Sequence, residues 1–243
     1  MTRPVAFISG ASGDIGHEIS IRLAKAGYDL ILHYHKNRSA MDKLLLEIEK
    51  TYKSNCKIFQ ADFADATETI SIIQSLSITP EVIVHNAGVS NSGLLQDISQ
   101  DELATEMAIG LITPSMITKE FLPAMISNKK GKIIFITSIW GETGASNEVS
   151  YSMIKGGQNA FVKALAKEVA PSGIQVNGIA PGAIKTKMLD EYTLEEMEHL
   201  ENSIPAGRIG EAREVAVAVE FLISPEMTYM NGHILRLNGA WYC

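Results

Sequence analysis

The most constraining feature of this sequence is a regular alternation of short apolar, β-branched runs with amphipathic segments of helical length. This pattern is typical of a parallel sheet covered by helices on both faces. The expected strands are residues 4–9, 28–34, 56–60, 81–85, 131–137, 174–179 and 232–236. The expected helices are about 15–26, 39–53, 66–76, 99–127 with a break, 149–170, 187–200 and 211–223. No linker or repeat interrupts the alternation, so we expect one domain over residues 1–243 with an α/β fold, a doubly wound parallel sheet of seven strands.

A glycine-rich stretch, SGASGDIG at residues 9–16, follows the first apolar run and leads into the first helical segment. Glycine allows positive φ and close backbone approach, and the free N–H groups at a helix start attract a pyrophosphate. The stretch therefore predicts a Rossmann-like dinucleotide-binding turn, although a tight turn with no ligand would use the same glycines. Because a carboxylate repels a pyrophosphate, we expect Asp14 to point away from the phosphates and cap the helix, while Gly13 supplies the close approach.

Composition narrows the class of function. The 243-residue chain is 46% hydrophobic and 20% charged, which is ordinary for a soluble globular protein. Its formal net charge of −7 argues against nucleic acid or an anionic membrane as a partner. We see no secretory leader and no continuous apolar run of about 18 residues, so a cytoplasmic location is expected. The two cysteines and six histidines form no convincing ligand set, and no metal is expected.

The stretch KMLDEYTLEEMEHL, residues 187–200, lies between two proline-containing loops and is rich in Glu and Met. Open α/β sheets bind ligands in the loops beyond the carboxyl ends of their strands. We therefore favour a substrate lid at about 185–205 over a solvated surface helix.

A second group of polar residues follows the fifth expected strand. Ser138 lies at the end of that strand, and thirteen residues later the stretch YSMIK places Tyr151 and Lys155 four positions apart. On a helix these two side chains share a face, so the ammonium can lower the pKa of the phenol from about 10. Such a phenol exchanges a proton with a carbonyl or alcohol oxygen, which the serine hydroxyl also holds. The three residues predict a carbonyl-reduction site, for which the glycine turn offers a nicotinamide nucleotide as hydride donor.

With these motifs, and with Asp62 in QADFAD, HNAG at 85–88, TS at 137–138 and PGAIKT at 181–186, the chain resembles the short-chain dehydrogenase/reductase family. The similarity runs from Val5 to about Gly239 and fits the shorter, single-domain branch. The resemblance implies that Ser138 positions the substrate carbonyl, that Tyr151 is the general acid, and that Lys155 lowers the tyrosine pKa and binds the nicotinamide ribose.

The resemblance also implies the other cofactor contacts. The glycine turn lines the pyrophosphate and ribose, the loop after the third strand brackets the adenine, HNAG passes beneath the adenosine ribose, and PGAIKT meets the nicotinamide. The residues concerned are Gly10, Ser12, Gly13, Ile15, Gly16, Asp62, Phe63, Asn86, Ala87, Gly88, Pro181, Gly182, Ile184 and Thr186.

Two positions depart from the family pattern. Asp14 replaces the middle glycine of the family turn, and the extra Gly13 gives a spacing more typical of the longer branch with its epimerases and dehydratases. The short length and the interval from Ser138 to Tyr151 still favour the reductase branch. Where many relatives carry asparagine on the fourth helix, this chain has Gly110. In the family the main-chain carbonyl at that position holds a water of the proton relay, so the relay is in doubt here.

The residues after the second strand bear on the choice of nucleotide. NAD-preferring relatives usually carry an aspartate there, whereas this chain has Tyr34 in LHYHKNR. Lys36 and Arg38 can face a 2′-phosphate, with His33 or His35 assisting, so we expect NADPH (NADP+). The alternative is a solvated loop with chance positive charge.

The expected substrate is a ketone, small or carried on a protein. The whole chain resembles 3-oxoacyl-[acyl-carrier-protein] reductases, while LHYHKN, SIWGETGAS and NGAWYC resemble bacterial reductases of the 5-aminopentanone group on a modified lysine of elongation factor P. A non-catalytic NADP(H)-binding sensor is the alternative from a different class. Trp140 lines the substrate pocket or packs in the core. Family members usually form tetramers, so a homotetramer is expected, with the C-terminal Trp241-Tyr242-Cys243 buried at the surface or in a subunit contact.

Overall fold

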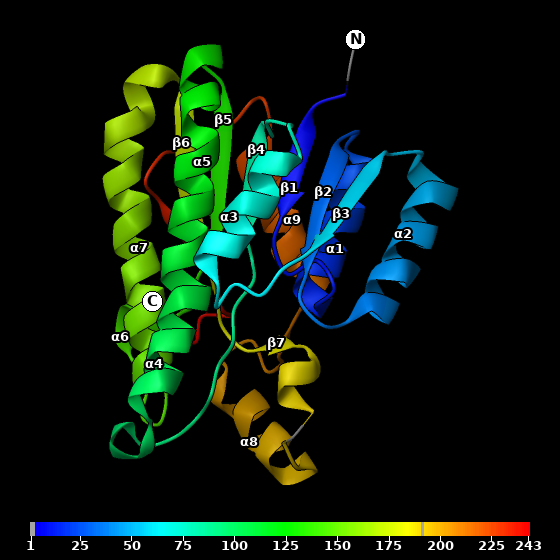
Figure 1. Ribbon diagram of the computed structural model, residues 1–243. Helices are drawn as coiled ribbons and strands as arrows, with labels where there is room; N and C mark the ends of the chain where they lie inside the picture. Colours follow the sequence, from blue (N-terminus) through cyan, green and yellow to red (C-terminus); the bar gives the residue numbers. More distant parts are fainter. Residues whose placement is uncertain (1–2, 191) are drawn as a thin grey trace.

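The computed structural model describes residues 3–190 and 192–243 and has three layers, a central sheet with helices on both faces (Figure 1). Within these residues, seven strands form the sheet in the order β3-β2-β1-β4-β5-β6-β9, with every neighbouring pair parallel. They are β1 (Val5–Ile8), β2 (Asp29–Tyr34), β3 (Cys56–Gln60), β4 (Val82–His85), β5 (Gly131–Ile136), β6 (Ile174–Pro181) and β9 (Ile234–Leu237). The predicted doubly wound α/β fold is confirmed, and each predicted strand overlaps an observed one.

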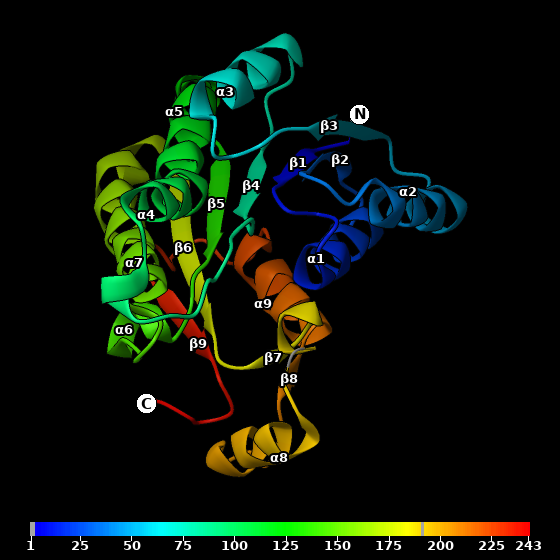
Figure 2. The same cartoon turned by 60° about the horizontal axis from the view of Figure 1, so that its bottom comes forward.

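The helices divide between the two faces of the sheet. They are α1 (Asp14–Lys25), α2 (Arg38–Tyr52), α3 (Ala66–Ser75), α4 (Gln100–Met107), α5 (Thr113–Asn128), α6 (Trp140–Thr143), α7 (Val149–Val169), α8 (Leu194–Ser203) and α9 (Ala212–Ile223). Apolar residues of α1, α2 and α9 form one buried cluster with the sheet, and those of α3, α5 and α7 form a second. These two sets of helices lie on opposite sides of the sheet (Figure 2). No helix among the described residues is both long and apolar enough to span a bilayer.

The predicted break in the long fourth helical segment is confirmed. A π turn at Ala108–Ile112 separates α4 from α5, and Gly110 lies buried in its middle. A π turn inserts one extra residue and shifts the hydrogen-bond register of the helix. This shift matters because α4 and the π turn both pack against α7.

The segment over residues 185–205, called the substrate-side segment below, does not form the single helix predicted over 187–200. Lys187–Leu189 form a single 3₁₀ turn, and α8 begins only at Leu194. The reason is a capping box, in which Thr193 accepts from the Glu196 backbone N–H and Glu196 accepts from the Thr193 backbone N–H. Glu191, inside the predicted helix, lies outside the described residues.

Two short strands that sequence patterning did not predict frame this segment. β7 (Ile184–Lys185) and β8 (Gly210–Glu211) pair in parallel, so the chain between them leaves and rejoins the body at one place. In both views α8 lies beyond the carboxyl ends of the main strands (Figures 1 and 2). Because β2 and β4 flank β1 on opposite sides, the strand order also reverses at β1, which opens a crevice at this same edge of the sheet.

Candidate active site

The glycine turn folds back tightly between β1 and α1. Gly10 has a φ of +65°, in the region that favours glycine, and a Cβ on Gly16 would lie 2.2 Å from the Gly10 carbonyl oxygen. A Cβ on Gly13 would lie 3.5 Å from the same oxygen, which is ordinary contact. The fold therefore requires glycine at positions 10 and 16, and it does not require glycine at position 13.

His33 at the end of β2 supports this turn, a role that the sequence did not reveal. Its Nδ1 accepts from the Gly10 N–H at 3.1 Å, so Nε2 carries the proton that is donated to the Ala61 carbonyl at 3.1 Å. The ring stacks on Phe63 with centroids 3.9 Å apart. Burial lowers the pKa of His33 to about 4, so the ring is neutral at pH 7 and does not assist a 2′-phosphate as a cation.

A first cavity of about 450 Å³ lies along the glycine turn and the loops after β2, β3 and β4. It brings together most of the predicted cofactor residues, namely Gly10, Ser12, Gly13, Ile15, Lys36, Asp62, Phe63, Asn86, Ala87, Gly88 and Thr186. Its remaining wall includes His35 and Asn37 beside Lys36, and Lys187 and Met188 from the substrate-side segment.

Gly16, Tyr34 and Arg38 are predicted cofactor residues that line neither this cavity nor the second cavity described below. Tyr34 is buried on the opposite face of the sheet, because successive strand residues alternate between faces and His33 takes the cavity side. Arg38 donates to Asp42 at 2.8 Å and to the Tyr34 hydroxyl at 3.4 Å. Of the two cations predicted to face a 2′-phosphate, Lys36 lines the cavity and Arg38 does not.

The prediction that Asp14 caps α1 is wrong. Gly13 is the N-cap residue and provides no side-chain cap, while Asp14 is the first helical residue. The Asp14 carboxylate instead accepts from the Lys187 backbone N–H at 2.8 Å, which ties the substrate-side segment to the glycine turn. The two residues are 173 positions apart, so local capping rules do not find this partner.

Ser138, Tyr151 and Lys155 meet where the loop after β5 faces the start of α7. The Lys155 Nζ lies 5.4 Å from the centroid of the Tyr151 ring. Lys155 is buried, and its ammonium donates to the Ile136 carbonyl at 2.8 Å and to Gln158 Oε1 at 3.3 Å. Ser138 Oγ accepts from the Trp140 backbone N–H at 3.2 Å, which orients the serine hydroxyl beside the tyrosine.

The ionisation of this group differs in part from the prediction. Burial raises the pKa of Tyr151 to about 12; the Ser138 hydrogen bond opposes this shift, and the negative charge of Glu148 adds to it. The predicted lowering of the tyrosine pKa by Lys155 is therefore wrong for this structure. Burial also lowers the pKa of Lys155 to about 8. At pH 7 the pair is a neutral phenol beside an ammonium.

A second cavity of about 560 Å³ contains this group and adjoins the first, with which it shares Ile15, Asn86, Gly88, Thr186 and Met188. Pro181 at the end of β6, Gly182 and Ile184 of β7 also line the second cavity. A ligand in the first cavity can therefore extend one end to the tyrosine, as a dinucleotide requires.

Aromatic side chains form the outer wall of the second cavity. Trp140 and Trp241 both line it, with ring centroids 5.4 Å apart, and Tyr242 packs edge-on against Trp140 at 5.5 Å. Trp140 is thus a cavity residue, one of the two placements that the sequence left open. The C-terminal residues fold back onto the site, although Tyr242 keeps 37% of its surface exposed.

Residues of the substrate-side segment close the cavity from outside. Met188, Leu189, Tyr192 and Leu200 line it, while Leu194 at the start of α8 is 91% exposed. This placement fits a lid at 185–205.

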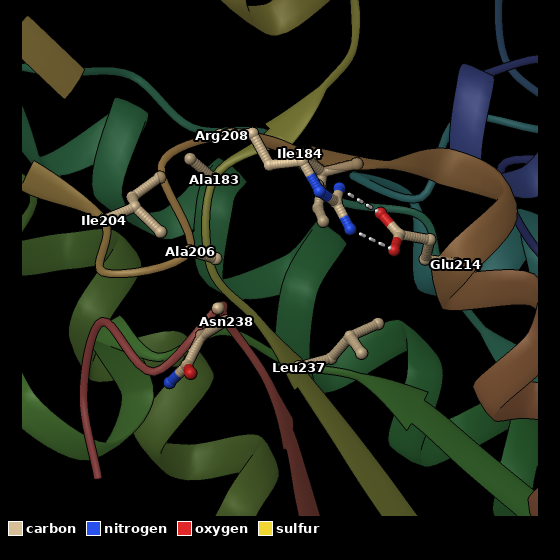
Figure 3. Close-up of a pocket in the computed structure, with 10 residues that line it drawn as sticks. Ala183, Ile184, Ile204, Ala206, Arg208, Glu214, Leu237 and Asn238 are labelled. Atoms are coloured by element: carbon tan, nitrogen blue, oxygen red, sulfur yellow. Dashed lines mark hydrogen bonds and ion pairs between the residues drawn. The ribbon is translucent and has the colours of Figure 1, made fainter. Parts of the chain in front are cut away.

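A third, small cavity of about 60 Å³ lies behind the return of this segment (Figure 3). Arg208 donates to both carboxylate oxygens of Glu214 at 2.7 and 2.8 Å, which anchors the end of the segment to α9. The cavity contains none of the predicted site residues except Ile184, and its wall includes Ile204 and Leu237. The cavity therefore lies where the chain returns from α8 to α9.

Comparisons with known proteins show similarity over nearly the whole chain. A family model described as enoyl-(acyl carrier protein) reductase matches residues 10–240. An uncharacterized oxidoreductase of Bacillus subtilis (strain 168) is 44% identical over 238 residues, 98% of each chain. A 3-oxoacyl-[acyl-carrier-protein] reductase of Vibrio harveyi is 31% identical over 240 residues, 98% of this chain and 97% of the relative.

Solved structures match over nearly the whole chain. The crystal structure of a 3-oxoacyl-[acyl-carrier protein] reductase from Brucella melitensis ATCC 23457 has a TM-score of 0.92 and 22% identity, covering 99% of this chain and 91% of that one. This match concerns the fold alone. A structure described as ElxO with NADP bound has a TM-score of 0.87 and 25% identity, covering 99% of both chains.

Proposed function

This chain belongs to the short-chain dehydrogenase/reductase family, and from that membership we propose that it is an NADPH-dependent ketone reductase. That it is an NAD(P)-dependent oxidoreductase follows from its relatives. One observation carries the finer proposal, namely that Tyr151, with Lys155 and Ser138 beside it, faces a cavity that is continuous with the one along the glycine turn.

The residues of the first cavity fit a nicotinamide dinucleotide. Gly10 and Gly16 allow the tight turn that brings Gly10, Ser12 and Gly13 to the cavity wall, and this turn leaves the start of α1 open to a pyrophosphate. Asp62 and Phe63 would hold the adenosine end, and Lys155 and Thr186 would hold the nicotinamide end. When bound, the reduced nicotinamide supplies a hydride to the carbonyl carbon.

The protein residues supply the proton. Ser138 and Tyr151 hold the carbonyl oxygen, and Tyr151 is a neutral phenol at pH 7 because its pKa is about 12. As the oxygen gains negative charge, the phenol gives up its proton to form the alcohol. The Lys155 ammonium then stabilises the phenolate, which requires the charged form of a lysine whose pKa burial lowers to about 8.

Two observations support NADPH over NADH. Lys36 lies on the wall of the first cavity just after β2, where its positive charge suits a 2′-phosphate. Tyr34 stands at the position where an aspartate favours NAD, and its side chain is buried on the other face of the sheet. The relative described with NADP bound is consistent with this choice.

For the substrate we propose a 3-oxoacyl thioester of an acyl carrier protein, as the relatives' names indicate for themselves. A specific observation favours a second candidate, the 5-aminopentanone group of a modified elongation factor P. The second cavity has Glu148 and the ring pair of Trp140 and Trp241 in its wall, and a carboxylate with aromatic faces suits an ammonium group.

The test is NADPH consumption with a short 3-oxoacyl pantetheine thioester, comparing the unaltered protein with Tyr151→Phe. We expect turnover that falls by about 10²–10⁴-fold in the variant, because only the proton donor is removed. NADPH binding should stay within about twofold. If no turnover is seen while NADPH still binds, the assay is repeated with elongation factor P carrying the ketone. Failure with both substrates would favour a non-catalytic NADP(H) sensor.

We also propose that the chain forms a homotetramer, the usual assembly of the family. In support, Ile112, Met116 and Met153 expose 38–49% of their surface on neighbouring helical faces, as do Val217 and Phe221 on α9. Light scattering at micromolar concentration measures the assembly directly, and a monomeric mass would refute the proposal.

A further inference from the structure

One buried amide lies beside the catalytic lysine. Gln158 is one turn after Lys155 on α7, and only 1% of its surface is exposed. Its Oε1 accepts from the Lys155 ammonium at 3.3 Å, and its Nε2 donates to the Gly110 carbonyl at 2.6 Å. A single carboxamide therefore connects the lysine to the π turn between α4 and α5.

The hydrogen bonds fix the direction of this amide. The Gly110 carbonyl can only accept, so the NH₂ group must face it, and the carbonyl oxygen of Gln158 must then face the lysine. The ammonium has three N–H donors, of which Ile136 and Gln158 take two. The third is left for the cavity side, where Tyr151 and the nucleotide site lie.

Gly110 is what allows this close approach. A Cβ at position 110 would lie 2.5 Å from Cγ2 of Ile154, the residue that precedes Lys155. Any larger residue would move the π turn away from α7 and lengthen the bond to Gln158. Gly110, which departs from the family pattern, thus occurs together with Gln158, whose amide donates to the Gly110 carbonyl.

We propose that Gln158 is a positioning residue for Lys155, which holds the ammonium in place and favours its charged form through an amide bridge anchored on Gly110. The bridge is a feature of the chain alone; its importance for proton transfer rests on the proposed reductase function. In this arrangement the Gln158 amide donates to the Gly110 carbonyl, the main-chain group that holds a water of the proton relay in the family.

The groups around Lys155 determine how the loss of the Gln158 acceptor should change the pKa of the lysine. Burial is what lowers the pKa of the lysine, Tyr151 is the titratable group in contact with it, and the charge of Glu148 acts on Tyr151. An acceptor for the ammonium opposes the effect of burial. Its removal should therefore lower the lysine pKa further.

The first experiment follows the Lys155 Cε resonance by NMR in protein labelled with ¹³C-lysine, with the assignment made by its loss in Lys155→Met. In the unaltered protein we expect a midpoint at about 8. In Gln158→Met, which keeps the volume and removes the acceptor, the midpoint should fall to about 7 or below. Gln158→Asn, which remains polar but is too short to reach both partners, should move it in the same direction.

Gln175 provides a matched control. It is also a buried glutamine, and its Nε2 donates to the Met230 carbonyl at 2.8 Å, away from the lysine. Gln175→Met should lower thermal stability and leave the Lys155 midpoint unchanged. An unchanged midpoint in folded Gln158→Met, or an equal shift in Gln175→Met, would overturn the proposal.

The second experiment measures kcat/KM for ketone reduction against pH. The basic limb of the profile should move to lower pH in Gln158→Met and in Gly110→Ala, and it should keep its place in Gln175→Met. If the protein is not a ketone reductase, the unaltered protein and all variants will lack this activity, and the NMR shift in Gln158→Met will still be observed. A basic limb that does not move in an active Gln158→Met variant would refute the positioning role itself.

Discussion

Replacement of Gly16 by alanine tests how the glycine turn is built. The added Cβ would lie 2.2 Å from the Gly10 carbonyl oxygen, 2.8 Å from its carbon and 2.9 Å from the Ala11 Cα. All three neighbours are backbone atoms, so no flexible side chain can move aside. Ordinary contact begins at 3.4 Å, and the turn must therefore shift by about 1 Å.

The turn has little freedom to make that shift. Gly10 is held at positive φ, its N–H is bound to His33, and a Cβ there would already lie 3.0 Å from the Ala87 Cα. Overpacking of this kind costs about 1–3 kcal/mol of stability. A displaced turn also misdirects the N–H groups at the start of α1, so we expect NADPH affinity to fall at least about tenfold, or about 1.4 kcal/mol.

The assay is an NADPH fluorescence titration together with a denaturant unfolding curve. Gly13→Ala is the matched control, since its Cβ would meet only an ordinary contact at 3.5 Å in the protein. That variant should keep the stability of the unaltered protein. Gly16→Ala with unchanged stability and unchanged NADPH affinity would refute the steric reasoning. A loss of NADPH affinity confined to Gly13→Ala would instead support its predicted close approach to the phosphates.

Three further predictions concern other parts of the site. Asp14→Ala removes the acceptor of the Lys187 N–H, so hydrogen exchange over residues 187–190 should accelerate while global stability falls by no more than about 1.5 kcal/mol; unchanged exchange would contradict the tie. Lys36→Glu should lower the ratio of kcat/KM for NADPH over NADH at least about tenfold, because a carboxylate repels a 2′-phosphate; a constant ratio would remove Lys36 from nucleotide choice. Ketone reduction should decline above pH about 8, because a lysine whose pKa is lowered by burial loses its charge there; a rate that is flat to pH 10 would refute the need for the ammonium.

The parts of the fold that sequence patterning predicts are those set by local periodicity. The buried apolar runs and the helix-length segments between them gave the seven strands and the sheet class. The two-residue strands β7 and β8 are too short to produce a pattern, and the start of α8 depends on the capping box at Thr193. Such details follow from a few hydrogen bonds, and hydrophobic periodicity does not register them.

Site residues were predictable where their chemistry is local. Tyr151 and Lys155 share a helical face, and Ser138 follows a strand that runs beside them. Asp14 and His33 were misread because their partners lie far along the chain, at Lys187 in one case and at the turn and Ala61 in the other. A polar residue in a glycine turn can cap the helix, bind a ligand or hydrogen-bond to a distant segment. Only the position of its partner in the folded chain shows which of these roles it has.

Gly110 is a similar case with a different outcome. The sequence showed that a family position had changed, but the compensating Gln158 lies 48 residues away and resembles any polar residue of a helix. The change becomes intelligible once the π turn and α7 are seen in contact, because glycine then removes a clash with Ile154 and exposes a carbonyl. A departure from a family pattern is therefore best judged together with its spatial neighbours.

In the reductase that we propose, burial sets the charge states of Tyr151 and Lys155 before the reaction. Burial and the charge of Glu148 keep Tyr151 protonated, so near neutral pH the site holds a proton ready for a carbonyl oxygen. Oxidation of an alcohol would need the phenolate first, which a pKa of about 12 makes scarce. As the phenol gives up its proton in the proposed mechanism, the Lys155 ammonium would stabilise the phenolate that forms. The raised pKa thus makes Tyr151 a weak acid and its phenolate scarce, so proton transfer in either direction depends on the nearby ammonium of Lys155.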